Sequence, residues 1–330
     1  MNINDENDIG VVFRKTLGHY TVHTLRSGRE IDCTLSSLIH KQLIFPTADP
    51  TSLRHAVQEV REVDHVDPVA IGDHVRYVDA GANRGRIVEI LPRRSKLSRP
   101  APVPGQRVFE QVIVSNADLI LPVFSAANPT PKWGLLDRYL VSAEAAGLPA
   151  LIVINKLDLA WKDSELDEEV EIYRRIGYTV LLVSAVTSEG IEELKQALQG
   201  KLSVMVGKSG VGKTSLLNAI QPGLGLRVKA VGNGEIGKGR HTTTHLEMFE
   251  LDFGGALVDT PGMREFGLWD IAAEELADLF PEMAEYVGQC KFGLSCHHDR
   301  EPGCAIRKAV MAGGISPYRY QSYMRLREEL

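Results

Sequence analysis

The order of two short motifs constrains the fold of this 330-residue chain more than any other feature. The tetrapeptide NKLD stands at residues 155–158, and the glycine-rich stretch GKSGVGKT follows it at 207–214. In α/β domains that bind guanine nucleotides, an NKxD tetrapeptide reads the base and normally comes well after the phosphate loop. Either NKLD is an ordinary Asx turn at the end of a strand, or such a domain has been reconnected in a different order.

The stretch at 207–214 matches the phosphate-loop pattern G-x-x-x-x-G-K-[ST] and has the flanking structure that this pattern requires. The apolar LSVMV before it predicts a buried strand, and TSLLNAI predicts the start of a helix. Main-chain N–H groups of the loop would hold the phosphates, Lys213 would reach the β- and γ-phosphates, and Thr214 would hold Mg²⁺. The predicted phosphate-site residues are Gly207, Lys208, Ser209, Gly210, Val211, Gly212, Lys213, Thr214 and Ser215.

Three further motifs follow apolar, strand-like runs. In NKLD, the Asp158 carboxylate can accept from the guanine N–H groups, Asn155 stands at the strand end, and the stem of Lys156 can lie on the base. In VSA, a main-chain N–H of Ser184 or Ala185 can point at guanine O6. In DTPG (259–262), Asp259 would bind Mg²⁺ through water, and the Gly262 N–H would sense the γ-phosphate. Carboxyl ends of parallel strands meet at one sheet edge, so we expect these motifs to gather there.

The motif order is a rotation of the usual one. The usual order is phosphate loop, switch threonine, DxxG, NKxD and SA, whereas here NKxD and SA come first. Joining the usual termini and opening a loop elsewhere preserves the sheet, because chain ends commonly lie near each other on the surface. The sequence therefore predicts a circularly permuted α/β domain.

Composition changes along the chain predict five segments. Alternating strand-like stretches at 20–25, 30–35, 73–78 and 85–91, with a short helix at 51–62, indicate an oligonucleotide-binding (OB) type of β-barrel. A Pro- and Arg-rich stretch reads as a linker, and alternating apolar strands and helices then indicate a three-layer α/β domain. The predicted segments are a disordered N-terminus (1–10), the barrel (11–91), the linker (92–107), the permuted domain (108–268) and a mainly helical C-terminal domain (269–330).

Three of the four cysteines crowd into one stretch with a histidine. Cys290, Cys296, His298 and Cys304 offer three thiolates and an imidazole, which suits a closed, structural Zn²⁺ site. His297 is an alternative ligand. The other interpretation is a set of buried free thiols or a redox pair.

The chain resembles the circularly permuted, small ribosomal subunit-dependent GTPases of the RsgA/YjeQ type. GKSGVGKTSLLN, GRHTTTH (239–245), DTPG and EPGC (301–304) carry the resemblance. It implies an OB-type barrel, a permuted P-loop GTPase domain and a zinc-binding domain. It also implies GTP hydrolysis that the small subunit stimulates and that drives release, in late small-subunit maturation. His298 keeps the family spacing to Cys304, whereas the first two cysteines enclose five residues where the family usually has four.

Met263 occupies the position after DxxG where Ras-like enzymes carry a water-orienting Gln. We therefore expect another group to position the attacking water, and His241 resembles the catalytic histidine proposed for the family. The alternative is a solvent-exposed loop histidine. One of Thr242, Thr243 and Thr244 would contact Mg²⁺, with Thr243 as the candidate alongside Thr214 and Asp259.

The formal net charge of −6 confines any RNA contact to local basic patches. The candidates, with a solvated linker as the alternative, are Arg84, Arg86, Arg93, Arg94, Lys96 and Arg99. The expected partners are the small ribosomal subunit, its rRNA and assembly factors. The polar N-terminus and the lack of an 18-residue apolar run predict a cytoplasmic protein without a membrane partner. A monomer is expected.

Two other functions fit parts of the pattern. A regulatory GTPase switch could dock on a non-ribosomal protein partner through the barrel and the zinc domain. An enzyme could use GTP for phosphoryl transfer to a small molecule, but no acceptor-binding motif supports this.

Overall fold

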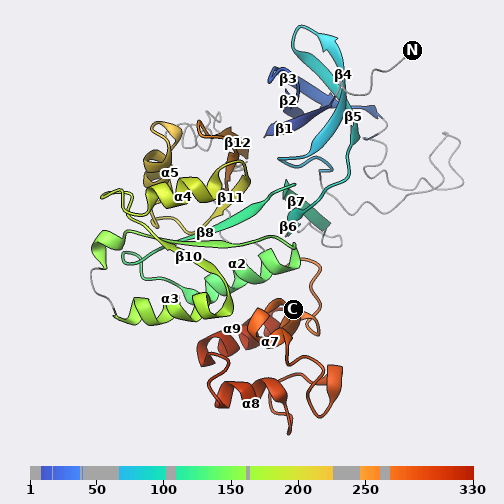
Figure 1. Cartoon of the computed structure of the whole chain (residues 1–330). Coiled ribbons are helices and arrows are strands. Elements are labelled where there is room, and N and C mark those ends of the chain that lie inside the picture. The colour runs from blue at the N-terminus through green and yellow to red at the C-terminus, as the bar shows by residue number, and fades with distance from the viewer. Residues whose placement is uncertain are drawn as a thin grey trace, which may run out of the picture. The chain divides into compact units, whose positions relative to one another are not determined.

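A computed structural model describes residues 9–16, 18–37, 39, 67–101, 109–160, 164–225, 246–260 and 268–330 (Figure 1). The chain forms two compact units. The first comprises residues 1–117 and 230–249, and the second comprises 118–229 and 250–330. No helix in the described ranges is long and apolar enough to span a membrane.

The first unit contains a closed five-stranded barrel. The strands pair in the order β1-β2-β3-β5-β4 and back to β1, and only the β3–β5 pair is parallel. In β3 every second residue is buried, because successive side chains of a strand point to opposite faces. The four predicted stretches correspond to β2, β3, β4 and β5. Strand β1 was not predicted, and its first two residues belong to the segment expected to be disordered. The predicted helix at 51–62 lies outside the described residues. The strands are β1 (Ile9–Thr16), β2 (His19–Thr24), β3 (Glu30–Leu35), β4 (His74–Gly81) and β5 (Arg84–Ile90).

A two-stranded antiparallel sheet follows the barrel, formed by β6 (Lys96–Ala101) and β7 (Phe109–Ser115). The stretch 92–107, which the sequence predicts to be a linker, contains strand β6. Its Leu97 side chain is buried, while the flanking Lys96 and Ser98 both contact Glu110. Such alternation between buried and exposed side chains is typical of a strand. The basic and proline-rich composition of the stretch indicated a linker instead.

The second unit holds a parallel sheet in the order β10-β9-β8-β11-β13. Strands β8 and β9 are buried along their whole length, as expected of strands covered on both faces. The strands are β8 (Leu119–Ser125), β9 (Leu151–Asn155), β10 (Thr179–Leu182), β11 (Leu202–Val206) and β13 (Ala256–Asp259), and the helices are α2 (Trp133–Ala145), α3 (Ser164–Ile176), α4 (Ile191–Leu198) and α5 (Lys213–Ile220). Strand β12 (Glu247–Glu250) pairs through Glu247 with Arg14 of β1.

The path of the chain through this sheet confirms the predicted permutation. From β8 the chain runs outward through β9 to β10, then returns to β11 on the other side of β8. The carboxyl ends of β8 and β11 therefore flank the point where the winding direction reverses. Ligands of open α/β sheets bind in the crevice at such a point.

The C-terminal part of the chain packs on α2 within the same unit. Its short helices surround an apolar core that includes Phe280, Ile306 and Tyr323, and Val141 of α2 joins this core. The elements are η2 (Leu276–Leu279), α7 (Pro281–Ala284), η3 (Gly293–Ser295), α8 (Ala305–Met311) and α9 (Pro317–Glu328). The domain boundary at residue 268 stays a prediction, because residues 261–267 are not described.

Candidate nucleotide site and metal centre

The phosphate loop runs from the end of β11 to the start of α5. Gly212 has a φ of 88°, and a Cβ there would lie 2.5 Å from Asn155 Nδ2. A Cβ at Gly207 would lie 2.4 Å from the main-chain oxygen of Val123. Glycine is therefore required at both positions, because the loop approaches its neighbours too closely for a side chain.

Lys213 is the first residue of α5 and folds back over the loop. Its Nζ donates to the main-chain oxygens of Gly207, at 2.5 Å, and of Lys208, at 3.3 Å. Burial lowers the pKa of Lys213, and the negative charge of Asp259 opposes this shift. Phosphate oxygens placed in the loop would be stronger acceptors than these carbonyl groups. Thr214 follows at the exposed start of the helix.

Asp259 ends β13 and is 6% exposed. Within the part of the chain that the structure describes, its Oδ1 has no hydrogen-bond partner. Burial raises the pKa of this carboxyl, while the charge of Lys213 lowers it. A buried oxygen without a partner costs free energy, and hydrated Mg²⁺ prefers oxygen ligands of this kind. The residues present therefore fit a Mg²⁺–nucleotide complex.

Asn155 joins the NKLD tetrapeptide to two other predicted motifs. It is 1% exposed; its Nδ2 donates to Val211 O at 3.1 Å, and its Oδ1 accepts from Ala185 N at 3.2 Å. The structure thus brings the phosphate loop, NKLD and the SA loop to one sheet edge. An isolated Asx turn would not produce this convergence.

The Asp158 and Lys156 side chains of NKLD are held by contacts with neighbouring loops. Ser184 Oγ donates to Asp158 Oδ1 at 2.5 Å, which orients an exposed carboxylate. Lys156 has a left-handed φ of 63°, and its Nζ donates to the main-chain oxygen of Gly210 at 2.6 Å. The Lys156 side chain therefore runs from the NKLD tetrapeptide to the phosphate loop.

The loop at 126–132, after β8, is a part of the site that the motif search missed. Lys156 Nζ also donates to the main-chain oxygen of Asn128, and Ser125 Oγ donates to that of Pro129 at 2.7 Å. The available signal was positional: β8 is the central strand, so its carboxyl-end loop had to lie at the same edge. Gly262, His241 and Thr243 fall in segments that the structure does not describe.

Four predicted metal ligands come together in the C-terminal part. The ligand atoms of Cys290, Cys296, His298 and Cys304 all lie within 4.8 Å of one another. Cys290 Sγ and Cys304 Sγ are 3.9 Å apart, and each lies 3.5 Å from His298 Nδ1. A tetrahedron with bonds of about 2.3 Å to sulfur has edges of roughly 3.8 Å, so these spacings fit Zn²⁺. His297 is 64% exposed and lies beside Glu301 instead.

Main-chain groups support the thiols of this cluster. Ala305 N donates to Cys290 Sγ at 3.2 Å, and Arg307 N donates to Cys304 Sγ at 3.4 Å, where Cys304 caps α8. Burial raises the pKa of Cys296 to about 12. Such a thiol stays protonated unless a cation displaces the proton, so metal binding is coupled to deprotonation here.

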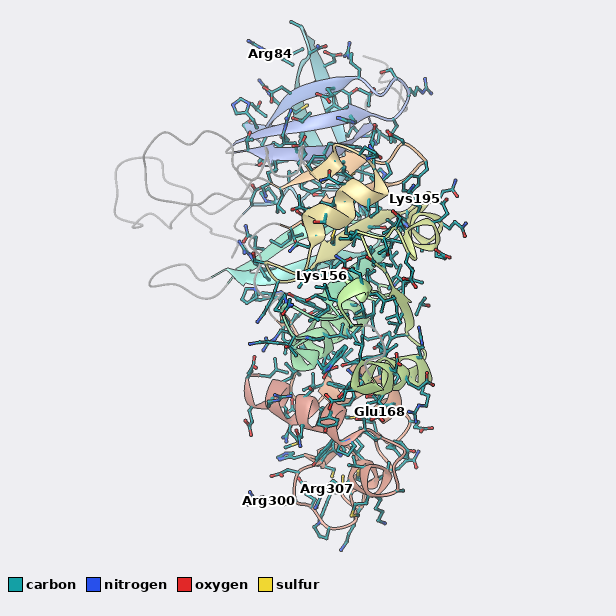
Figure 2. The ribbon with its side chains drawn as sticks, turned by 90° about the vertical axis from the view of Figure 1, so that its left-hand side faces the viewer. Arg84, Lys156, Glu168, Lys195, Arg300 and Arg307 are labelled. Carbon is teal, nitrogen blue, oxygen red and sulfur yellow. The ribbon has the colours of Figure 1, made fainter. Side chains whose placement is uncertain are left out.

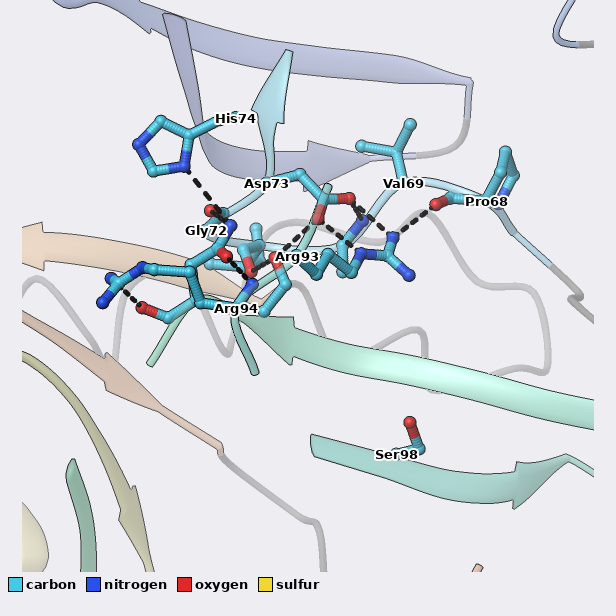
Figure 3. Close-up of polar contacts among 12 residues, drawn as sticks. Pro68, Val69, Gly72, Asp73, His74, Arg93, Arg94 and Ser98 are labelled. Atoms are coloured by element: carbon cyan, nitrogen blue, oxygen red, sulfur yellow. Dashed lines mark hydrogen bonds and ion pairs between the residues drawn. The ribbon is translucent and has the colours of Figure 1, made fainter. Parts of the chain in front are cut away.

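Four of the six basic RNA-contact candidates have partners within the first unit. Arg93 forms two bonds of 2.7 Å with the fully buried Asp73, and this buried pair gives it a structural role (Figure 3). Arg94 Nη2 donates to Asn116 O, Lys96 pairs with Glu110, and Arg99 Nε donates to Gln111.

Arg84 and Arg86 of β5 are exposed, and Figure 2 shows the Arg84 side chain on the outside of the barrel. They line a shallow groove of about 730 Å³ together with Thr34, Val78 and Val88. The exposed cations and apolar side chains of this groove suit a nucleic-acid backbone and its bases.

The sequence model described as RsgA GTPase matches residues 90–269. The chain belongs to the RsgA GTPase family. It is 46% identical to the small ribosomal subunit biogenesis GTPase RsgA of Gemmatimonas aurantiaca over 321 residues, 97% of each chain. It is 44% identical to the protein of that name from Azotobacter vinelandii over 254 residues, 76% of this chain and 72% of the relative.

Two solved structures are similar to the chain over nearly its whole length. YjeQ from Thermotoga maritima matches with a TM-score of 0.74 and 32% identity, over 98% of each chain. YloQ, described as a circularly permuted GTPase, matches with a TM-score of 0.68 and 29% identity, over 100% of this chain and 97% of its own. These matches confirm the family resemblance and the permuted fold inferred from the motif order.

Proposed function

We propose that this RsgA-family chain hydrolyses GTP while bound to the small ribosomal subunit and its rRNA, late in subunit maturation. The subunit stimulates hydrolysis, and hydrolysis drives release. One observation carries the proposal: Asn155 holds NKLD, the SA loop and the phosphate loop together, although these motifs lie in rotated order along the chain. The names of the relatives point to the same partner.

The proposed roles include those of Thr243 and His241, which lie outside the described residues. Lys213 and the loop N–H groups hold the phosphates, and Asp158 and Lys156 bind guanine. Thr214 and Asp259 hold Mg²⁺ with Thr243, and His241 orients the attacking water. The Cys₃His cluster holds a structural Zn²⁺, which keeps the small C-terminal domain folded. We further propose a cytoplasmic monomer that meets other assembly factors on the subunit.

The test measures GTP turnover with and without purified small ribosomal subunits, with ATP as the control nucleotide. Strong stimulation confined to GTP and to this subunit is the expected result. GTP turnover that the subunit leaves unchanged would contradict the ribosomal partner and favour a regulatory GTPase with a protein partner. Equal turnover of ATP would contradict the roles of Asp158 and Lys156.

A further inference from the structure

Arg319 of α9 is a buried charge at the contact between the C-terminal helices and the nucleotide-binding part of the second unit. The residue is 2% exposed, and its Nη1 lies 2.6 Å from Asp137 Oδ1. Its Nε and Nη2 bind the two oxygens of Glu282, at 2.7 and 3.1 Å. Its guanidinium carbon lies 4.5 Å from the centre of the Phe280 ring. Such a geometry fixes one arrangement of these helices, because a displaced partner would leave a charge unpaired.

Asp137 brings helix α2 into this network. Tyr173 of α3 donates its hydroxyl to Asp137 Oδ1 at 2.8 Å. The Tyr173 ring also packs against Trp133, the first residue of α2, with centroids 5.8 Å apart. The first two turns of α2 are therefore fixed from two sides, by α3 and by α9.

Helix α2 begins directly after the 126–132 loop, so its position sets the position of that loop. The loop supplies the Asn128 oxygen that holds Lys156 Nζ. It also places Pro129 against the phosphate loop, where a Cβ at Gly210 would lie 3.7 Å from Pro129 Cδ. A shift of α2 would thus displace Lys156, which faces the base side of the site.

The same helix α9 reaches the metal centre. The Tyr320 hydroxyl donates to the main-chain oxygen of His298 at 2.6 Å. Helix α9 consequently contacts the Cys₃His cluster through Tyr320 and α2 through Arg319, one residue earlier. This arrangement makes α9 a physical connection between the C-terminal domain and the nucleotide site.

We propose that Arg319 and Asp137 are positioning residues of the nucleotide site, which hold Lys156 in place through α2 and the 126–132 loop. Affinity for the guanine base therefore depends on how the C-terminal helices sit on α2. By linkage, a partner that moves these helices alters guanine affinity, and bound nucleotide alters affinity for that partner. The inference rests on the proposed binding of guanine nucleotides by this site.

The experiment uses the full chain with all three charges neutralised, Asp137→Asn, Glu282→Gln and Arg319→Met. Neutral replacement of a buried ionic group often preserves folding. We expect the Kd for GDP to rise about tenfold, because Lys156 loses its fixed position, a change that corresponds to about 1.4 kcal/mol. The Kd for pyrophosphate, which has no base, should stay within about twofold. Asp137→Asn alone leaves Arg319 paired with Glu282 and should raise the GDP Kd by about threefold.

The matched control is Arg138→Met, which removes the ion pair between Arg138 of α2 and Glu329, the residue that follows α9. This pair is half-exposed on the Glu329 side, so the GDP Kd should not change. A folded neutralised variant with unchanged GDP affinity would overturn the inference, as would an equal loss of GDP and pyrophosphate binding. Failure of the unaltered protein to bind GDP would instead overturn the proposed function.

Discussion

Asn155 donates to the main-chain oxygen of Val211 across 3.1 Å, although the two residues stand 56 positions apart. This bond closes the nucleotide site across the junction that the permutation rearranged. Strand β9, which ends at Asn155 of NKLD, comes first in the chain and the phosphate loop comes second. The two nevertheless lie side by side at one edge of the parallel sheet.

Replacing Asn155 by Ala should weaken binding of GDP and GTP by roughly 5- to 150-fold. The change removes a buried side chain whose hydrogen bonds join three loops. Losing these bonds should reduce the free energy of nucleotide binding by about 1–3 kcal/mol. Titration with a fluorescent guanine nucleotide measures the effect. Asn83→Gly, in a barrel turn where Asn83 has a φ of 55°, should leave the affinity unchanged. Equal affinities for the Asn155 variant and the unaltered chain would refute the bridging role.

Replacing His241 by Ala should abolish subunit-stimulated GTP turnover and leave the Kd for nucleotide nearly intact. Met263 follows DxxG and cannot orient water, so the histidine is our candidate for that role. Single-turnover hydrolysis on purified small subunits gives the measurement. Stimulated turnover at the unaltered rate would remove His241 from the mechanism.

Replacing Cys296 by Ser should reduce the zinc content from one ion per chain and lower the temperature of unfolding. The cluster offers one tetrahedral set, and a small domain of this kind depends on its metal. Elemental analysis and thermal unfolding are the measurements. Cys33→Ser is the matched control, because Cys33 is a buried cysteine of the barrel that does not belong to the cluster, so its loss should leave the zinc content unchanged. Full zinc content in the Cys296 variant would contradict the ligand set.

Replacing both Arg84 and Arg86 by Ala should weaken binding to small-subunit RNA without changing the unfolding temperature. The slope of log K plotted against log[salt] should become less steep by about 2, because two phosphate contacts are lost. Arg29→Ala is the control, because Arg29 is paired with Asp79 on the same barrel. An unchanged salt slope for the double variant would assign RNA binding elsewhere.

Mild acid should destabilise the first unit through His74. Burial, and then the charge of Arg94, lower the pKa of His74 below its ordinary 6.5. The unfolded chain therefore binds the proton more tightly, so stability falls as the pH drops through 6.5 toward the folded-state pKa. Urea unfolding between pH 7.5 and 5.5 should show a smaller loss in His74→Gln than in the unaltered chain. Parallel curves for the two proteins would exclude His74 as the cause.

Motif spacing predicted the nucleotide site because its chemistry lies at strand ends, where sequence order and sheet position are linked. The close spacing of cysteine and histidine residues in the sequence likewise predicted that Cys290 and Cys304 belong to one cluster. It could not show that Arg93 is committed to Asp73, because that pairing depends on a barrel turn that is distant in the sequence. Nor could it find Arg319, whose partner Asp137 belongs to another part of the chain. Strand β6 was not predicted, because its proline and arginine residues indicated a linker and the alternation around Leu97 was not used.

The central position of β8 has a consequence for synthesis of the chain. Strand β9, one neighbour of β8 in the sheet, is translated soon after β8. Strand β11, the other neighbour, is translated much later: Leu202 N at its start donates to Asp118 Oδ2, 84 positions earlier in the chain. Until then the nascent chain presents an unpaired edge on a strand of seven buried residues. Translation thus completes β8, β9 and β10 first, and the proposed nucleotide can stabilise the domain only after β11 and the phosphate loop have been made.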